Sequence, residues 1–254
     1  MPPVAATPIL GAPVSALKCD QLVNQMVKWA ESRESRVVCV ANVHMVMEAH
    51  SDPTFCQVLE AADLVTPDGM PLVWALRLFG KREQDRAAGM DLLMAISSAG
   101  EQRGLKLFLV GSTPEVLSKI RARLAVDYPR LIVVGAISPP FRDLMPEEEA
   151  HTVAAINASG AHFVLVALGC PKQEKWMGRH RGQIEAVMVG LGGAFPVYAG
   201  IQKRAPAWMR NIGLEWVFRL ALEPKRLWRR YFTTNLPFVW LLSIEVVHRF
   251  LVRR

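Results

Sequence analysis

Two charged residues in the N-terminal half of the chain have the types and positions of groups that act in catalysis. Asp68 stands between Pro67 and Gly69, directly after an apolar stretch. A carboxylate at the C-terminal end of a strand is well placed to act as a general base, although Pro-Asp-Gly is also a typical turn sequence. Arg86 precedes Asp91 by five residues and could pair with a phosphate group or remain a solvated surface arginine.

Turns rich in glycine and polar residues follow the apolar runs of the chain. In open parallel sheets, ligands bind beyond the C-terminal ends of the strands. Gly111, Ser112 and Thr113 precede a helix-like stretch, so their backbone amides could cradle a phosphate or could form an ordinary capped turn. The Gly190–Gly193 turn holds half of a dinucleotide-binding fingerprint, but Phe195 stands where the third glycine is needed. The other turns of this kind are Asn42–His44, Thr66–Gly69 and Gly169–Glu174.

No metal-binding pattern is recognisable in the sequence. Asp-x-Asp, the common ligand pair of a metal-bridged diphosphate, does not occur, and the six histidines form no ligand set. The four cysteines are scattered without a Cys-x-x-Cys pair, which is typical of reduced thiols in a cytosolic protein. We therefore expect neither metal nor cofactor. Negative charge on a leaving diphosphate would be met by Arg, Lys, backbone N–H groups or a helix dipole.

Apolar runs alternate with helix-like stretches over most of the chain. Short β-branched runs separated by helices of about ten or more residues indicate a parallel sheet with helical crossovers. The sequence thus predicts an α/β fold with a Rossmann-like sheet, and a helical, basic C-terminal appendage. Pro114 stands at the first position of one helix, after the N-cap candidates Ser112 and Thr113. The predicted strands are 36–41, 64–66, 105–110, 131–136, 163–168 and 186–191, and the predicted helices of this part are 53–62, 91–103, 114–126 and 147–158.

Basic charge is concentrated in the C-terminal segment. The net charge is +7, and residues 202–254 carry 11 basic and 3 acidic residues, or +8, against 19 and 20, or −1, in the rest. Tryptophan interleaved with arginine is typical of helices in a lipid headgroup region, whereas solvated basic helices and a nucleic-acid-binding module are the alternatives. The predicted helices are 207–222, 225–233 and 238–252, with Pro224 as a stop or kink.

The sequence predicts a peripheral rather than a membrane-spanning protein. The longest apolar run, 236–247, is interrupted by Glu245 and is shorter than the roughly 20 residues that span a bilayer. The first residues lack the basic and long apolar regions of a secretory signal. We expect an α/β catalytic domain at 1–200 and a membrane-associating appendage at 201–254 that binds an anionic surface, without a nucleic-acid partner. The exposed surface of the appendage could favour self-association into a homo-oligomer.

Taken in order, these turns and the C-terminal segment resemble the WecG/TagA/CpsF family of glycosyltransferases, glycosyltransferase family 26. The resemblance extends from about Val38 to Phe238. Its motifs are Ala41-Asn42-Val-His, Ala62-Asp63-Leu-Val-Thr-Pro67-Asp68-Gly69, Arg86-Ala-Ala-Gly89-Met-Asp91-Leu, Phe108-Leu-Val-Gly111-Ser, Gly169-Cys-Pro171-Lys172-Gln173-Glu174-Lys-Trp176, Gly192-Gly193-Ala-Phe195, Ala199-Gly200, Lys203-Arg204-Ala-Pro206, Leu214-Glu215-Trp216, Arg219-Leu and Glu223-Pro224-x-Arg226.

The resemblance implies a reaction and a location. Members of the family transfer a sugar from a UDP-sugar to a sugar on an undecaprenyl diphosphate carrier, with inversion and without an essential metal. Their products enter teichoic acid linkage units, enterobacterial common antigen or exopolysaccharides. The location implied is the cytoplasmic face of the bacterial inner membrane. An NAD-type oxidoreductase built on the Gly190–Gly193 turn is the alternative enzyme class.

The resemblance also implies roles for individual residues. Asp68 would deprotonate the acceptor hydroxyl, Asn42 and Gln173 would shape the pocket, and Arg86 would meet the diphosphate. Arg219, Arg226 and Arg229 would close over the site, on one helix face if the axis continued through Pro224. The strand-end turns and this carry-over together give five further substrate-binding candidates, Gly111, Ser112, Lys172, Gly192 and Gly193.

Three departures from the family pattern concern the donor sugar. Val40 replaces a frequent threonine, Pro196 replaces a frequent aspartate, and 138–141 reads Ser-Pro-Pro-Phe instead of an Asp-Gly-Tyr-Phe-like segment. The last variant resembles the proteobacterial exopolysaccharide branch, which includes the xanthan-type glucosyltransferase. UDP-glucose, UDP-N-acetylmannosamine and its uronic acid are therefore all candidate donors.

Overall fold

The structure is a computed structural model that describes residues 6–142 and 144–252. The described residues form two compact units, and each is described by itself. Of these residues, one unit comprises 6–18, 41–88 and 204–252, and the other comprises 19–40, 89–142 and 144–203. Whether residues 201–254 act as a membrane-associating appendage to a catalytic domain at 1–200 stays a prediction.

Six of the described strands form the main sheet. They are β3 (Arg36–Ala41), β4 (Leu64–Pro67), β5 (Leu107–Gly111), β6 (Val133–Ile137), β7 (Phe163–Ala167) and β8 (Val187–Gly190). Their order is β4-β3-β8-β7-β5-β6, and the pairs β3–β8, β8–β7, β7–β5 and β5–β6 are parallel. The predicted α/β fold with a parallel sheet is therefore confirmed.

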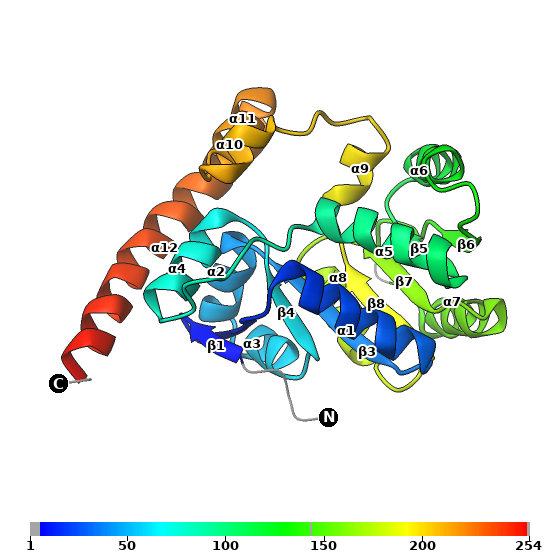
Figure 1. Cartoon of the computed structure of the whole chain (residues 1–254), viewed down its shortest axis with the longest axis horizontal. Helices are drawn as coiled ribbons and strands as arrows, with labels where there is room; N and C mark the ends of the chain where they lie inside the picture. The colour runs from blue at the N-terminus through cyan, green and yellow to red at the C-terminus, as the bar shows by residue number, and fades with distance from the viewer. Residues whose placement is uncertain (1–5, 143, 253–254) are drawn as a thin grey trace. The chain divides into compact units, whose positions relative to one another are not determined.

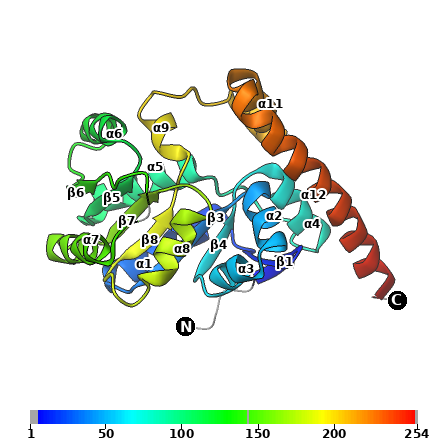
Figure 2. The same cartoon turned by 180° about the vertical axis from the view of Figure 1, so that it is seen from behind.

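Helices cover the strands of the second unit. They are α1 (Cys19–Glu31), α5 (Gly89–Arg103), α6 (Pro114–Asp127), α7 (Pro146–Ser159), α8 (Lys172–Arg179) and α9 (Ala194–Tyr198). Figures 1 and 2 show α1 and α5 on one face of these strands and α8 on the other. Every residue of β5, β7 and β8 is buried, as expected of continuous apolar strands that are covered on both faces. The predicted N-cap of α6 is confirmed, because Thr113 Oγ1 accepts from the Val116 amide at 3.3 Å.

The first unit joins an N-terminal hairpin to the C-terminal helices. Its elements besides β4 are β1 (Ala6–Ile9), β2 (Ala12–Ser15), α2 (Val43–Ser51), α3 (Pro53–Glu60), α4 (Met70–Leu78), α10 (Ala207–Asn211), α11 (Glu215–Leu222) and α12 (Pro224–Val252). β1 and β2 are antiparallel, and α12 packs against α2. Glu245 accepts from the Leu10 amide at 2.9 Å, and Arg249 donates to the Pro8 carbonyl at 2.6 Å. These contacts fix the C-terminal half of α12 to the hairpin.

The C-terminal helices differ from their predicted bounds. The predicted helix 207–222 is divided at Gly213, whose φ of 75° is left-handed. The predicted helices 225–233 and 238–252 form one helix, α12, with Pro237 inside it. A proline removes one hydrogen bond from a helix interior. Leu227 and Phe238, before and after the proline, are each 2% exposed, so packing of both parts holds the helix together across it. Pro224 is the first residue of α12, where a missing N–H is tolerated.

Candidate active site

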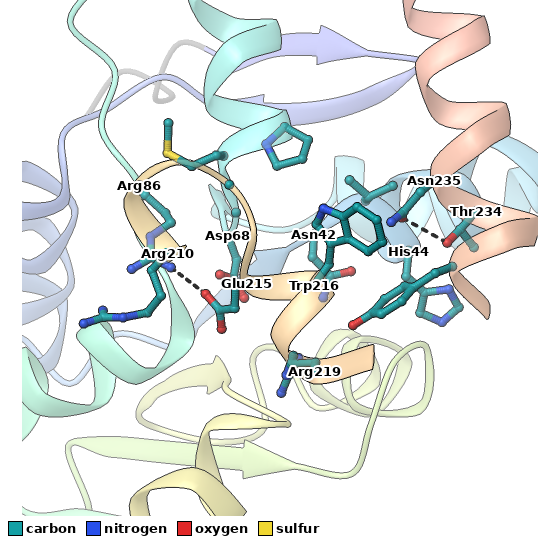
Figure 3. Close-up of a pocket in the computed structure, with 16 residues that line it drawn as sticks. Asn42, His44, Asp68, Arg86, Arg210, Glu215, Trp216, Arg219, Thr234 and Asn235 are labelled. Carbon is teal, nitrogen blue, oxygen red and sulfur yellow. Dashed lines mark hydrogen bonds and ion pairs between the residues drawn. The ribbon is translucent and has the colours of Figure 1, made fainter. Parts of the chain in front are cut away.

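A pocket in the first unit contains four of the predicted site residues (Figure 3). It holds about 740 Å³ of empty space, including its open mouth. Its walls come from the turns after β3 and β4, from the loop before α5, and from α10, α11 and α12. Asn42, Asp68, Arg86 and Arg219 line it, together with Val43, His44, Gly69, Met70, Pro71, Arg210, Gly213, Glu215, Trp216, Tyr231, Thr234 and Asn235.

Backbone hydrogen bonds fix Asp68 and Asn42 in this pocket. The amide of Asp68, the first residue after β4, donates to the Ala41 carbonyl at 2.7 Å. Asn42 follows Ala41 and caps α2, because its Oδ1 accepts from the Met45 amide at 3.1 Å. Gly69 has a φ of 104°, which allows the chain to turn directly into α4. The carboxylate of Asp68 and the carboxamide of Asn42 therefore line the pocket from two strand ends that are joined by a backbone hydrogen bond.

Arg86 is a mostly buried cation in the same pocket. Its side chain is 11% exposed, and its Nη1 donates to Glu215 Oε2 at 2.9 Å, as the dashed line in Figure 3 marks. Arg210 and Arg219 also line the pocket. Guanidinium groups bind phosphate oxygens through paired N–H donors. A pocket lined by several arginines and one strand-end carboxylate can hold an anion and accept a proton.

The C-terminal helices complete the wall of the pocket. The ring of Trp216 on α11 meets the ring of Tyr231 on α12 edge to face, with centroids 5.9 Å apart. At Gly213, between α10 and α11, an added Cβ would lie 2.6 Å from Cη2 of Trp74. Only glycine fits this close approach and its left-handed φ. The turn that presents α11 to the pocket therefore depends on Gly213.

The predicted arginine face is not continuous. α11 ends at Leu222 and α12 begins at Pro224, so Arg219 and Arg229 lie on separate helices. Arg229 is exposed and does not line the pocket of Figure 3. Arg226 lies in α12, but its side chain is outside the described part of the structure. The interruption at Glu223, next to Pro224, is the physical reason for this difference.

A second cavity, in the second unit, contains Ser112 and Lys172. It holds about 980 Å³ of empty space, including its open mouth, and lies at the ends of β5 and β7. Ser112 has a φ of 58°, and its amide donates to the Ala167 carbonyl at 2.9 Å. A Cβ at Gly111 would overlap that same carbonyl oxygen, so Gly111 allows β5 and β7 to approach closely. The charged residues of the lining are Arg142, Glu149, Lys172, Lys175 and Arg179.

Gln173 lies under the Gly190–Gly193 turn, in the second unit. It is 4% exposed, and a Cβ at Gly192 would be 3.2 Å from its Oε1. Its Nε2 donates to Glu174 Oε1 at 2.7 Å. Burial raises the pKa of Glu174 to about 7, while hydrogen bonds from Gln173 and Cys170 act in the opposite direction. Gly193 precedes α9 as its N-cap residue. The third-glycine position of the fingerprint is Phe195, which is fully buried.

Within the described residues, no three His, Cys, Asp or Glu side chains gather as a metal-binding group. The four cysteines are free thiols, and Cys39 is buried whereas the other three are partly exposed.

Comparison with known proteins identifies the family. The family model described as the glycosyl transferase WecG/TagA/CpsF family matches residues 7–250 of the chain. The chain belongs to this family. It is therefore a glycosyltransferase, and of the classes that the sequence left open, the family match supports this one.

Two similar proteins carry the same name, N-acetylglucosaminyldiphosphoundecaprenol N-acetyl-beta-D-mannosaminyltransferase. The protein of Bacillus spizizenii is 33% identical to this glycosyltransferase over 203 residues, which cover 80% of this chain and 77% of the relative. The protein of Bacillus subtilis is 30% identical over 203 residues, with the same coverage.

Sequence reasoning missed several residues of the pocket in this glycosyltransferase. Glu215 and Trp216 belong to a motif of the family resemblance, but nothing in the sequence places them in one pocket with Arg86. Arg210, Tyr231, Thr234 and Asn235 also line the pocket and were not predicted. Besides that motif, the basic, aromatic composition of residues 202–254 was the available signal.

Proposed function

We propose that this glycosyltransferase moves a hexose or an N-acetylhexosamine from a UDP-sugar to a sugar carried on undecaprenyl diphosphate, with inversion and without a metal. The observation that carries the proposal is the shared pocket of Asp68, Arg86 and Arg219. The names of the two Bacillus relatives support this class of acceptor, and they describe transfer of N-acetylmannosamine. The product would enter a cell-surface polysaccharide.

In the proposed reaction, Asp68 acts as the general base. Its carboxylate takes the proton of the acceptor hydroxyl while that oxygen attacks the anomeric carbon of the donor. The bond from the anomeric carbon to the diphosphate oxygen breaks, and the electron pair leaves with UDP. A single displacement inverts the anomeric centre. Arg86 and Arg219 neutralise the charge that develops on the leaving group, and Asn42 orients the sugars. Gln173 does not line this pocket, so its predicted role in shaping a substrate site stays a prediction.

The second cavity is assigned to substrate binding as well. Its lining contains two lysines and two arginines against one glutamate, so its charge favours an anionic ligand. Ser112 and Lys172 are the residues that we assign to this ligand, with Gly111 holding the turn. We also assign Gly192 and Gly193, on the Gly190–Gly193 turn, to substrate binding.

The exposed face of α12 supports a peripheral membrane location. Large apolar side chains recur on this face every three or four residues, which places them on the side opposite the buried Leu227, Thr234 and Phe238. Lys225 and Arg229 are also exposed. None of the described helices is long and apolar enough to cross a membrane. The exposed apolar residues are Trp228, Phe232, Leu236, Val239, Trp240, Ile244, Val247 and Leu251.

We therefore propose that α12 lies in the headgroup region of an anionic bilayer, at the cytoplasmic face of a bacterial membrane. Basic residues near such a surface contribute roughly 1 kcal/mol each, so a few engaged side chains suffice. Self-association through this face stays a prediction.

A panel of nucleotide sugars tests the proposed function. Purified protein is offered UDP-glucose, UDP-N-acetylmannosamine and its uronic acid, each with a short-chain lipid diphosphate that carries N-acetylglucosamine, in the presence of a chelator. We expect one UDP-sugar to give a product whose mass increases by that sugar, and NMR to show an inverted anomeric centre. Transfer only from a non-uridine nucleotide sugar, or retention of configuration, would contradict the proposal.

A further inference from the structure

The ion pair between Arg86 and Glu215 has a consequence for substrate binding. The guanidinium of Arg86 is 11% exposed, whereas the carboxylate of Glu215 is 37% exposed. Both side chains line the pocket that contains Asp68. Glu215 is the first residue of α11, so this ion pair joins the C-terminal segment to the loop before α5.

A mostly buried guanidinium needs a negative partner. Arginine stays protonated at all accessible pH values, and a buried charge without a partner is strongly unfavourable. Glu215 supplies one such negative charge at 2.9 Å. A diphosphate carries more charge than one carboxylate and offers several oxygens for bidentate pairing. It is the better partner for the same guanidinium.

The two anionic partners exclude one another. A diphosphate at Arg86 would stand beside the carboxylate of Glu215 in a pocket that already holds Asp68, and like charges at such distances repel. We infer that Glu215 is a positioning residue that holds Arg86 until substrate binds, and that the diphosphate of the donor displaces its carboxylate. This inference rests on the proposed function, in which Arg86 meets the diphosphate.

The exchange also links the anion site to α11. Trp216 and Arg219 follow Glu215 on the same helix and line the same pocket. When Glu215 leaves Arg86, the first turn of α11 loses this ion pair with the loop before α5. Occupation of the anion site therefore changes the restraint on the helix that carries Arg219, the second arginine proposed to meet the leaving group.

The direction in which Glu215→Gln changes the affinity for anions separates this role from a merely structural one. Glu215→Gln keeps the size and one hydrogen bond but removes the competing charge. If Glu215 only stabilised the pocket, the substitution would weaken anion binding. If it holds the place of the anion, the substitution strengthens binding, by about fivefold as for a partly exposed ion pair.

Calorimetric titration of the full-length protein with inorganic pyrophosphate and with UDP measures this directly. We expect Glu215→Gln to bind both more tightly, Glu215→Asp to bind close to wild type, and Arg86→Gln to remove the gain from Glu215→Gln in the double variant. Glu83→Gln is the matched control, because it deletes the carboxylate of an exposed pair with Lys18 outside the pocket. Its affinities should not change.

Two results would overturn the inference and are distinguishable. If wild type binds UDP tightly and Glu215→Gln binds it equally or more weakly, then the diphosphate does not displace Glu215, and the proposed function is unaffected. If neither wild type nor Glu215→Gln binds pyrophosphate or UDP, then both the displacement of Glu215 and the proposed UDP-sugar donor are contradicted.

Discussion

The backbone amide of Asp68 donates to the carbonyl of Ala41 at 2.7 Å, and this bond places Asp68 next to the residue that caps α2, Asn42. The same Asn42 side chain thus has two functions, since it caps a helix through Met45 and faces the pocket. The two functions can be separated by substitution.

Asn42→Asp should separate the cap from the pocket. Aspartate caps helices about as well as asparagine, whereas alanine at an N-cap costs about 1 kcal/mol of stability. We expect Asn42→Asp to unfold at the wild-type temperature but to show a KM for the donor raised by roughly tenfold, because a second carboxylate repels the anionic donor. Asn42→Ala should lose stability as well. Thermal unfolding and transfer kinetics check both variants; a wild-type KM in Asn42→Asp would exclude Asn42 from the donor site.

Gly111→Ala should lower the stability of the folded protein. The added Cβ would overlap the carbonyl oxygen of Ala167, and Gly111 has a φ of 106°. We expect a loss of about 3 kcal/mol or more in the free energy of unfolding. Gly104→Ala is the control, since Gly104 has a φ of 69° with nothing within 4 Å of its Cβ position; it should lose only about 1 to 2 kcal/mol. Urea unfolding of both variants measures the difference, and equal losses would contradict the close approach of β5 and β7.

Glu174 should make stability depend on pH. Its folded pKa of about 7 lies above the ordinary 4.5, so the folded state binds more protons than the unfolded state between these values. Stability therefore falls as pH rises from about 4.5 to about 7, by at most about 1.4 kcal/mol per pH unit, and is level above that. Glu174→Gln cannot titrate. Urea unfolding between pH 5 and 8 should show that the variant gains stability relative to wild type as pH rises. A stability difference that stays constant over this range would contradict a buried carboxyl group with a raised pKa.

The exposed face of α12 should control membrane binding. Replacing Phe232, Leu236 and Trp240 together by serine removes three side chains that are 59–68% exposed, so folding should be little changed. Partitioning to anionic liposomes should fall by on the order of tenfold or more, because it scales with the apolar area inserted. Val126→Ser is the control, because Val126 is an apolar residue of the second unit that is even more exposed, at 79%. Unchanged flotation of the triple variant would contradict the proposed orientation of α12.

The strands of the sheet could be predicted because they are short apolar runs, and those of β5, β7 and β8 are buried throughout. Phe163–Ala167 and Leu107–Gly111 were predicted within two residues. The hairpin at Ala6–Ser15 was missed, since its strands have four residues each and contain prolines. The continuity of α12 was missed because Pro237 is a strong local signal for a break, whereas the packing of Leu227 and Phe238 on either side is a tertiary effect.

The pocket was predictable only where local sequence determines position. Asp68 and Asn42 follow strands, and the ends of neighbouring parallel strands meet at one edge of a sheet. The partner of Arg86 was not predictable, because Glu215 lies 129 residues further along the chain. The close approach at Gly213 likewise depends on Trp74, a residue of a different helix. Pairings of this kind depend on how the C-terminal segment packs on the rest of the first unit.

The central claim is that Asp68 deprotonates the acceptor, and Asp68→Asn tests it most directly. The substitution keeps the shape of the side chain and the backbone bond to Ala41. The measurement is single-turnover transfer from the active UDP-sugar to the lipid-linked acceptor, with UDP affinity and thermal unfolding recorded on the same sample. We predict wild-type folding and UDP binding with a transfer rate lowered by about 10² to 10⁴. Transfer at the wild-type rate would contradict the account.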